Sequence, residues 1–137
     1  MSYQIVPFEE LLGKTLKEVR KESSEVGATW RDGQDDTLTF VTETGEHYEQ
    51  RHSQDCCESV TIDDICGDLD DLIGVPILLA EETSNEDPNA SESATWTFYK
   101  LSTVKGSVTI RWYGESNGWY SESVDLKKYT ERDWERS

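Results

Sequence analysis

The strongest strand pattern lies in the C-terminal third of the chain. Aromatic and β-branched residues dominate residues 95–101, 107–113 and 119–126, and such residues are enriched in β-strands. The turn-forming residues Gly106 and Gly118 separate the three runs. This pattern predicts a three-stranded antiparallel meander.

A second alternating pattern spans residues 36–52. Leu38 and Phe40 alternate with threonine, which gives the period of two that a half-buried strand requires. Thr44 and Gly45 interrupt the pattern and predict a hairpin turn. We therefore expect two paired strands here.

Four other segments have weaker patterns. Residues 15–22 fit a helix or a strand, and the strand is favoured because Gly13 can end the preceding element. The short apolar run at 75–80 predicts a buried strand. Residues 83–94 are polar without periodicity, so we expect a mobile loop there, and residues 127–137 are expected to form a charged tail.

Helical spacing of apolar residues occurs in two short segments, residues 8–13 and 63–73. The second segment has an apolar stripe at i, i+4, i+7 and i+8, and Gly74 can end the helix. The predicted fold class is therefore α+β, with a mainly antiparallel β-sheet, the C-terminal meander and these two short helices. The length of 137 residues suits a single domain. The stripe consists of Ile65, Leu69, Leu72 and Ile73.

The negative charge is concentrated in the middle of the chain. The formal net charge is −16, and residues 31–94 hold 18 acidic and two basic side chains. Direct binding to nucleic acid is not expected, because attraction to phosphate needs a basic surface. No apolar run approaches the roughly 18 residues of a membrane helix, and the first residues do not resemble a secretion signal. We therefore expect a cytoplasmic protein that does not enter membranes.

Histidine, cysteine and carboxylate side chains gather in one short stretch. Zinc commonly takes thiolate and imidazole ligands, and a Cys–His pair can act as a nucleophile. The usual Cys-x₂-Cys spacing is absent, so buried cysteines are the favoured interpretation, while a metal site and a reactive thiol stay open. No cofactor is expected. The cluster consists of His52, Asp55, Cys56, Cys57, Glu58 and Cys66.

Two further groups are candidates for contact with a partner. The aspartates Asp63, Asp64, Asp68, Asp70 and Asp71 lack the spacing of a calcium-binding loop and fit a solvated face better. Consecutive residues of a strand point to opposite faces, so only some of the aromatic residues around residue 116 can lie in the core. The others would be exposed anchors for a partner. These aromatic residues are Trp112, Tyr113, Trp119 and Tyr120.

Three motifs carry a resemblance to known proteins: DCCESV at 55–60, DICGDLDDLIG at 64–74 and RWYGESNG at 111–118. Together they resemble an uncharacterised family of small phage and prophage proteins, over about residues 8–126. The resemblance implies an origin in a bacteriophage and action in the bacterial cytoplasm. The resemblance does not imply that the protein is an enzyme.

These observations favour a small acidic binding protein encoded by a phage. It would inhibit host defence by presenting the five aspartates and exposed aromatic residues to a basic groove of a nuclease or CRISPR effector. One alternative is a binder of a nucleotide-type ligand at Arg111, Trp112 and Tyr120. Another is a metal- or thiol-dependent enzyme at His52, Cys56 and Cys57. Assembly into a homo-oligomer stays open.

Overall fold

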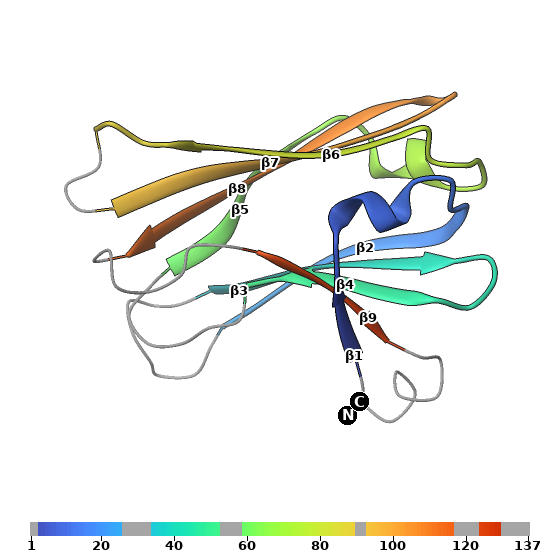
Figure 1. Ribbon diagram of the computed structural model, residues 1–137, viewed down its shortest axis with the longest axis horizontal. Coiled ribbons are helices and arrows are strands. Elements are labelled where there is room, and N and C mark those ends of the chain that lie inside the picture. The colour runs from blue at the N-terminus through green and yellow to red at the C-terminus, as the bar shows by residue number, and fades with distance from the viewer. Residues whose placement is uncertain (1–2, 26–33, 53–58, 90–92, 117–123, 130–137) are drawn as a thin grey trace.

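A computed structural model describes residues 3–25, 34–52, 59–89, 93–116 and 124–129. Within these ranges the chain forms two antiparallel sheets that face each other (Figure 1). The five-stranded sheet has the order β1-β9-β4-β3-β2, and the four-stranded sheet has the order β5-β8-β7-β6. The strands are β1 (Tyr3–Val6), β2 (Leu16–Glu25), β3 (Gln34–Thr42), β4 (His47–Arg51), β5 (Ser59–Cys66), β6 (Leu79–Glu86), β7 (Ser93–Thr103), β8 (Gly106–Ser116) and β9 (Asp125–Tyr129).

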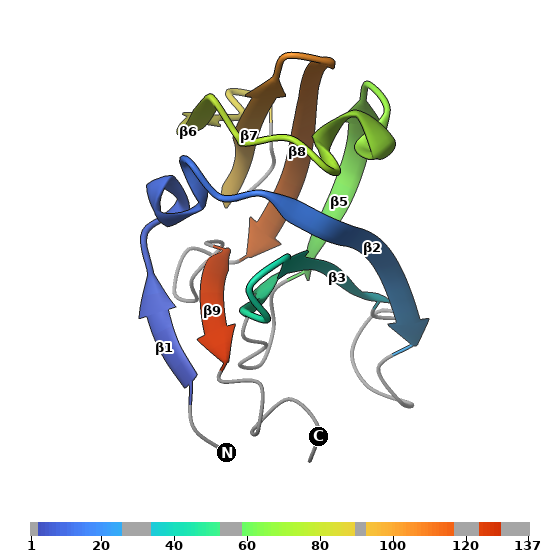
Figure 2. The ribbon, with the colours of Figure 1, turned by 90° about the vertical axis from the view of Figure 1, so that its right-hand side faces the viewer.

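The hydrophobic core lies between the two sheets, which Figure 2 shows from the side. Alternate residues of β8 are buried in it, namely Val108, Ile110 and Trp112. Leu38 and Phe40 of β3 enter the same core from the other sheet. Each such side chain contributes about 1.5–3 kcal/mol by its removal from water, so this alternation is what holds the sheets face to face.

The prediction of a helix at 63–73 is wrong. Residues up to Cys66 belong to β5, and only a 3₁₀ turn, η3 (Leu69–Leu72), follows. A bulge between Ile62 and Asp64 adds one residue to β5. Ile62 and Ile65 therefore both pack against the core although they are three residues apart. The bulge thus gives a strand the apolar spacing of a helix.

The helix expected at 8–13 is also reduced to a 3₁₀ turn, η1 (Phe8–Leu11). The turn ends at Leu11, and the next residue, Leu12, has an extended backbone conformation. No α-helix occurs in the residues that the structure describes. The predicted α+β class is therefore wrong, and the fold is a β-sandwich built from antiparallel sheets.

The predicted meander is correct for its first two strands, whereas most of the third, at 119–126, lies outside the described residues. β7 and β8 pair from Ser93↔Ser116 to Thr103↔Gly106. The next strand, β9, crosses to the other sheet and pairs with β1 and β4. The second neighbour of β8 is β5. Consecutive strands are neighbours in only about two-thirds of cases, and here β9 is one of the exceptions.

Several boundaries differ from the sequence-based expectation. The hairpin within 36–52 and the strand at 15–22 are confirmed by β3, β4 and β2. β6 begins only at Leu79, so most of the apolar run at 75–80 precedes it. β6 also continues to Glu86, into the segment expected to be a loop. The first residues of the expected tail belong to β9, and residues 130–137 lie outside the described ranges.

Candidate docking surface on the four-stranded sheet

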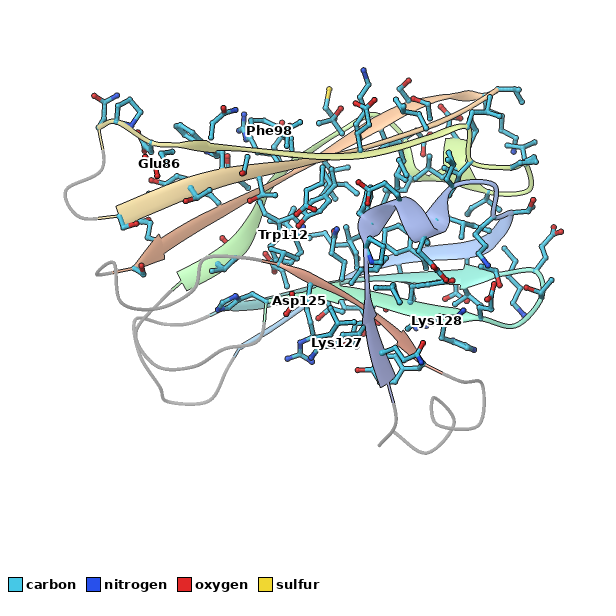
Figure 3. All side chains as sticks on the ribbon, viewed as in Figure 1. Glu86, Phe98, Trp112, Asp125, Lys127 and Lys128 are labelled. Atoms are coloured by element: carbon cyan, nitrogen blue, oxygen red, sulfur yellow. The ribbon has the colours of Figure 1, made fainter. Side chains whose placement is uncertain are left out.

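Three aromatic residues form a strip on the outer face of the four-stranded sheet. Trp96 and Phe98 of β7 alternate with buried residues of the core, and Tyr113 of β8 follows the buried Trp112. Figure 3 shows Phe98 and Trp112 on opposite sides of this sheet. All three strip residues are partly exposed. We call Trp96, Phe98 and Tyr113 the aromatic strip.

Contacts within the strip fix the ring of Tyr113. Trp96 and Tyr113 are cross-strand partners, and their ring centroids lie 5.2 Å apart at an interplanar angle of 47°. The Tyr113 hydroxyl donates a hydrogen bond to Asp87 Oδ2 at 2.9 Å. Burial, and after it the Asp87 carboxylate, raises the pKa of Tyr113 to about 12. The phenol therefore stays protonated at neutral pH and the strip keeps its shape.

An ion pair borders the strip at its β5 side. Arg111 donates from Nε to Asp63 Oδ2 at 2.7 Å, and its second nitrogen lies 2.6 Å from the same oxygen. The β5 bulge supplies Asp63 as the extra residue beside the Asp64–Arg111 pair. The guanidinium charge is thereby neutralised by a neighbour. Such a pair is a poor receptor for a phosphate group, because the phosphate would have to displace the carboxylate.

Carboxylates gather along both edges of this sheet. One edge consists of β5 and η3, and the other is β6. Within the described residues of 59–116, only Lys100, Lys105 and Arg111 are basic, and Lys105 Nζ already donates to the carbonyl of Ile73 at 2.7 Å. The aromatic strip therefore lies between two acidic edges. The edge carboxylates are Asp63, Asp64, Asp68, Asp70 and Asp71 on one side and Glu81 and Asp87 on the other. Glu82 and Glu86 also belong to β6, but their cross-strand partners Tyr99 and Thr95 place them on the opposite face from the strip.

The residues expected to contact a partner lie in different parts of the structure. Asp63, Asp64 and Tyr113 lie on or beside the strip face. Asp68 instead caps η3, where its side chain accepts a hydrogen bond from the Asp70 amide at 2.9 Å, and Asp70 and Asp71 lie within that turn. Trp112 is wrong as a candidate for contact with a partner, because this side chain is only 1% exposed and lies in the core. Trp119 and Tyr120 lie outside the described residues.

Trp96 and Phe98 were missed by the sequence analysis. The available signal was their spacing of two, with Thr97 between them. The run of aromatic and β-branched residues at 95–101 identifies a strand, but it does not show which of its residues face the core. The burial of Tyr99 and Leu101 determines that the even-numbered neighbours point outward.

The proposed cysteine and histidine cluster is only partly covered by the structure. His52 is buried just after β4, whereas Cys66 is an exposed free cysteine at the end of β5 in the other sheet. Asp55, Cys56, Cys57 and Glu58 lie outside the described residues. Among the residues that are described, no three His, Cys, Asp or Glu side chains form a group suited to a metal ion.

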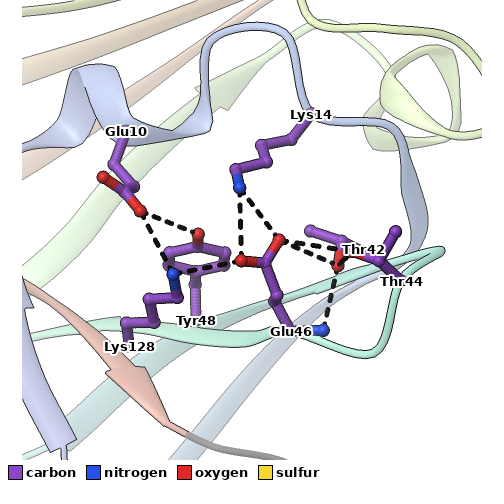
Figure 4. A network of polar contacts seen from close by, with 7 residues as sticks. All are labelled: Glu10, Lys14, Thr42, Thr44, Glu46, Tyr48 and Lys128. Atoms are coloured by element: carbon purple, nitrogen blue, oxygen red, sulfur yellow. Dashed lines mark hydrogen bonds and ion pairs between the residues drawn. The ribbon is translucent and has the colours of Figure 1, made fainter.

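A second polar cluster, drawn in Figure 4, connects the N-terminal segment to the β3–β4 hairpin. Glu46 lies 3.0 Å from the Nζ atoms of both Lys14 and Lys128. Lys128 also lies 3.3 Å from Glu10, which accepts a hydrogen bond from Tyr48 at 3.3 Å. Two lysines thus face two glutamates, so this cluster is neutral. Its contacts suit a structural role.

The hydrogen bonds of this cluster shift the titration of its members. Burial alone would raise the pKa of Glu46, but the hydrogen bonds from Lys14 and Lys128 outweigh it and lower the pKa below 4.5. The hydrogen bond to Glu46 raises the pKa of Lys128 above 10.5. Both partners are therefore charged at neutral pH.

The model of a protein family, DUF7448, matches residues 9–126. The chain belongs to the DUF7448 family. The family is described as a domain of unknown function, so membership assigns no activity. The matched region of this DUF7448 protein contains β2 to β8 in full, including the aromatic strip and both acidic edges.

No significant similarity was found to any curated protein or to any solved structure. Among the described residues of the DUF7448 chain, no helix has the length and apolar character needed to cross a membrane. The geometry of the strip and its edges is therefore the main evidence on function.

Proposed function

We propose that this DUF7448 protein is a non-enzymatic binding protein that docks a basic partner protein on the outer face of its four-stranded sheet. The observation that carries the proposal is the aromatic strip between two acidic edges. Partly exposed aromatic side chains are frequent energetic anchors of protein interfaces. Carboxylates around them speed the approach of a basic partner and disfavour an acidic one.

We propose further that the partner is a bacterial nucleic-acid-binding protein, such as a nuclease or a CRISPR effector. Residues 31–94 supply 18 of the 29 acidic side chains of the chain, and the grooves of such proteins carry the basic groups that bind phosphate. The resemblance to phage proteins supports an anti-defence role in the cytoplasm of an infected bacterium. The protein would then compete with nucleic acid for the same groove.

The described residues bear on one of the two alternative functions, the binder of a nucleotide-type ligand, and do not favour it. A nucleotide site at Arg111 and Trp112 would need a free cation and an accessible ring. Arg111 is paired with Asp63, and Trp112 is buried in the core. The alternative enzyme at His52, Cys56 and Cys57 is not tested, because Cys56 and Cys57 lie outside the described residues.

Competition with nucleic acid tests the proposal. Purified bacterial nucleases and CRISPR effectors are loaded with labelled DNA, and the protein is added at low and at physiological ionic strength. We expect release of the DNA from at least one effector, and weaker release at the higher ionic strength because salt screens exposed charges. Binding that leaves the DNA in place, or that is indifferent to salt, would contradict the proposal.

A further inference from the structure

A pocket opens on the side of the sandwich where the edge strands β1 and β6 lie. Figure 2 shows these two strands on the same side of the molecule. The pocket has a volume of about 270 Å³, which is slightly smaller than the sites of drug-sized ligands. It lies between the sheets, away from the aromatic strip on the outer face. Its lining consists of Ile5, Val6, Pro7, Phe8, Glu82, Tyr99, Val124, Asp125 and Leu126.

Six of the nine residues that line the pocket have apolar side chains. Phe8 and Leu126 are buried members of the core, and Ile5 is 62% exposed at the rim. The rings of Phe8 and Tyr99 lie with their centroids 4.7 Å apart. Aliphatic groups can pack against such walls, and aromatic rings attract a cation that approaches their faces.

The polar groups of the pocket are almost all acceptors. The Tyr99 hydroxyl lies 2.9 Å from Glu82 Oε2 and 3.2 Å from the carbonyl oxygen of Val124. This hydroxyl has one hydrogen to donate. Asp125 is also among the lining residues, and its negative charge acts on Tyr99. The described lining residues include no Lys or Arg. Acceptor oxygens therefore outnumber donor hydrogens, and the lining itself supplies no cation for Glu82 or Asp125, although Arg51 lies outside the lining as the cross-strand neighbour of Asp125.

The titration of Tyr99 agrees with this arrangement. Burial, and after it the negative charges of Glu82 and Asp125, raises the pKa of Tyr99 far above 10. The phenol therefore remains neutral and donates its hydrogen.

We propose that this pocket binds an alkylammonium group, which is a primary amine at the end of a short aliphatic chain. An ammonium has three hydrogens to donate and no acceptor, which complements the oxygens of Glu82, Asp125 and Val124. The aliphatic chain contacts the apolar wall. The same chemistry is found in a free alkylamine and in the side chain of a lysine. This proposal does not depend on the docking surface.

Titration with n-butylammonium chloride, followed by the amide NMR signals of Val6, Phe8 and Leu126, tests the proposal. We expect saturable shifts at these residues. Butanol has the same aliphatic chain and no charge. Its apparent affinity should therefore be at least about tenfold lower, because the charge-assisted hydrogen bonds are lost. Equal binding of butanol, or no saturable shift with butylammonium, would overturn the proposal.

Two isosteric variants locate the charges that bind the amine. Glu82→Gln and Asp125→Asn should each weaken butylammonium binding by about tenfold, since each removes a charged acceptor. Gln can still accept the Tyr99 hydrogen bond, so an unchanged melting temperature is expected. The control is Glu81→Gln, an exposed neighbour on β6 that does not line the pocket. Equal effects of Glu81→Gln and Glu82→Gln would contradict the assignment.

A further titration distinguishes a free alkylamine from a lysine side chain as the ligand. N-acetyl-lysine-N-methylamide carries the same ammonium on a peptide-like backbone. Binding comparable to that of butylammonium supports a lysine side chain of a partner as the ligand. Binding of butylammonium alone supports a free amine, and binding of neither compound refutes the site.

Discussion

Trp112 of β8 and Gln50 of β4 form a hydrogen bond that connects the two sheets through the core. The indole Nε1 donates to Gln50 Oε1 at 3.0 Å, and both side chains are 1% exposed. The Gln50 Nε2 has no hydrogen-bond partner among the described residues. Gln50 is thus present in an apolar core mainly to satisfy the indole, which would otherwise be a buried donor without an acceptor.

Replacing Gln50 should therefore destabilise the fold. Gln50→Leu leaves the Trp112 indole unpaired, and we expect a loss of about 1–3 kcal/mol in the free energy of unfolding. Urea denaturation measures it. A double-mutant cycle with Trp112→Phe should show that the Gln50 replacement costs less once the indole donor is gone. If Gln50→Leu were as stable as the wild type, the role assigned to this hydrogen bond would be contradicted.

Gly67 distinguishes the observed strand and turn from the helix that the sequence suggested. In a helix, Gly67→Ala would stabilise by about 1 kcal/mol. In the structure, Gly67 has φ +115°, and an added Cβ would lie 2.5 Å from the Ser107 carbonyl oxygen. We therefore expect Gly67→Ala to destabilise by about 1–3 kcal/mol, as backbone strain of this kind does.

Gly13 provides the matched control. It also has a positive φ, +83°, but an added Cβ would meet nothing within 4 Å. Gly13→Ala should cost only the conformational strain, about 1 kcal/mol. Thermal or urea denaturation of both variants measures the difference. A stabilised Gly67→Ala, or a larger loss in Gly13→Ala, would contradict the turn described here.

The cluster around Glu46 predicts a loss of stability in acid. The pKa of Glu46 is lowered in the folded state, so its contribution is complete above 4.5 and is lost as pH falls through the folded pKa. Glu46→Gln should destabilise at neutral pH by about 0.5–1 kcal/mol, and the deficit should vanish in strong acid. Urea denaturation over this pH range measures both variants.

Glu43→Gln is the control for this pH dependence. Glu43 is an exposed residue at the end of the same hairpin. Its replacement should leave the difference from wild type nearly constant with pH. If Glu46→Gln showed the same flat profile, the ion pairs with Lys14 and Lys128 would not contribute to stability as described.

Local patterns predicted the hairpins better than they predicted the overall architecture. The alternation around Leu38 and the turn at Gly45 were sufficient for β3 and β4. The position of β9 between β1 and β4 depends on contacts between distant segments, which a local pattern does not contain. At β5 the bulge at Asp63 replaced the period of two by a spacing of three, and the pattern was mistaken for a helix.

The candidate surface was only partly predictable for a similar reason. Alternation shows that neighbouring aromatic residues of a strand face opposite ways, but a shift of one residue exchanges the two faces. Alternation alone therefore leaves Trp112 a candidate for either face, and the structure places it in the core. Phe98 became visible as a surface residue only once the packing of Tyr99 against Phe8 was known.

The most direct test of the docking surface compares two exposed apolar residues at different places. Phe98→Ser removes one of the three rings of the aromatic strip, whereas Leu12→Ser removes a side chain that is 53% exposed beside η1. The measurement is the affinity of each variant for the effector whose DNA the wild-type protein displaces. We predict that Phe98→Ser weakens binding by about 2 kcal/mol, roughly thirtyfold in Kd, and that Leu12→Ser binds like the wild type. Equal affinity of the two variants would contradict the claim that the outer face of the four-stranded sheet is the docking surface.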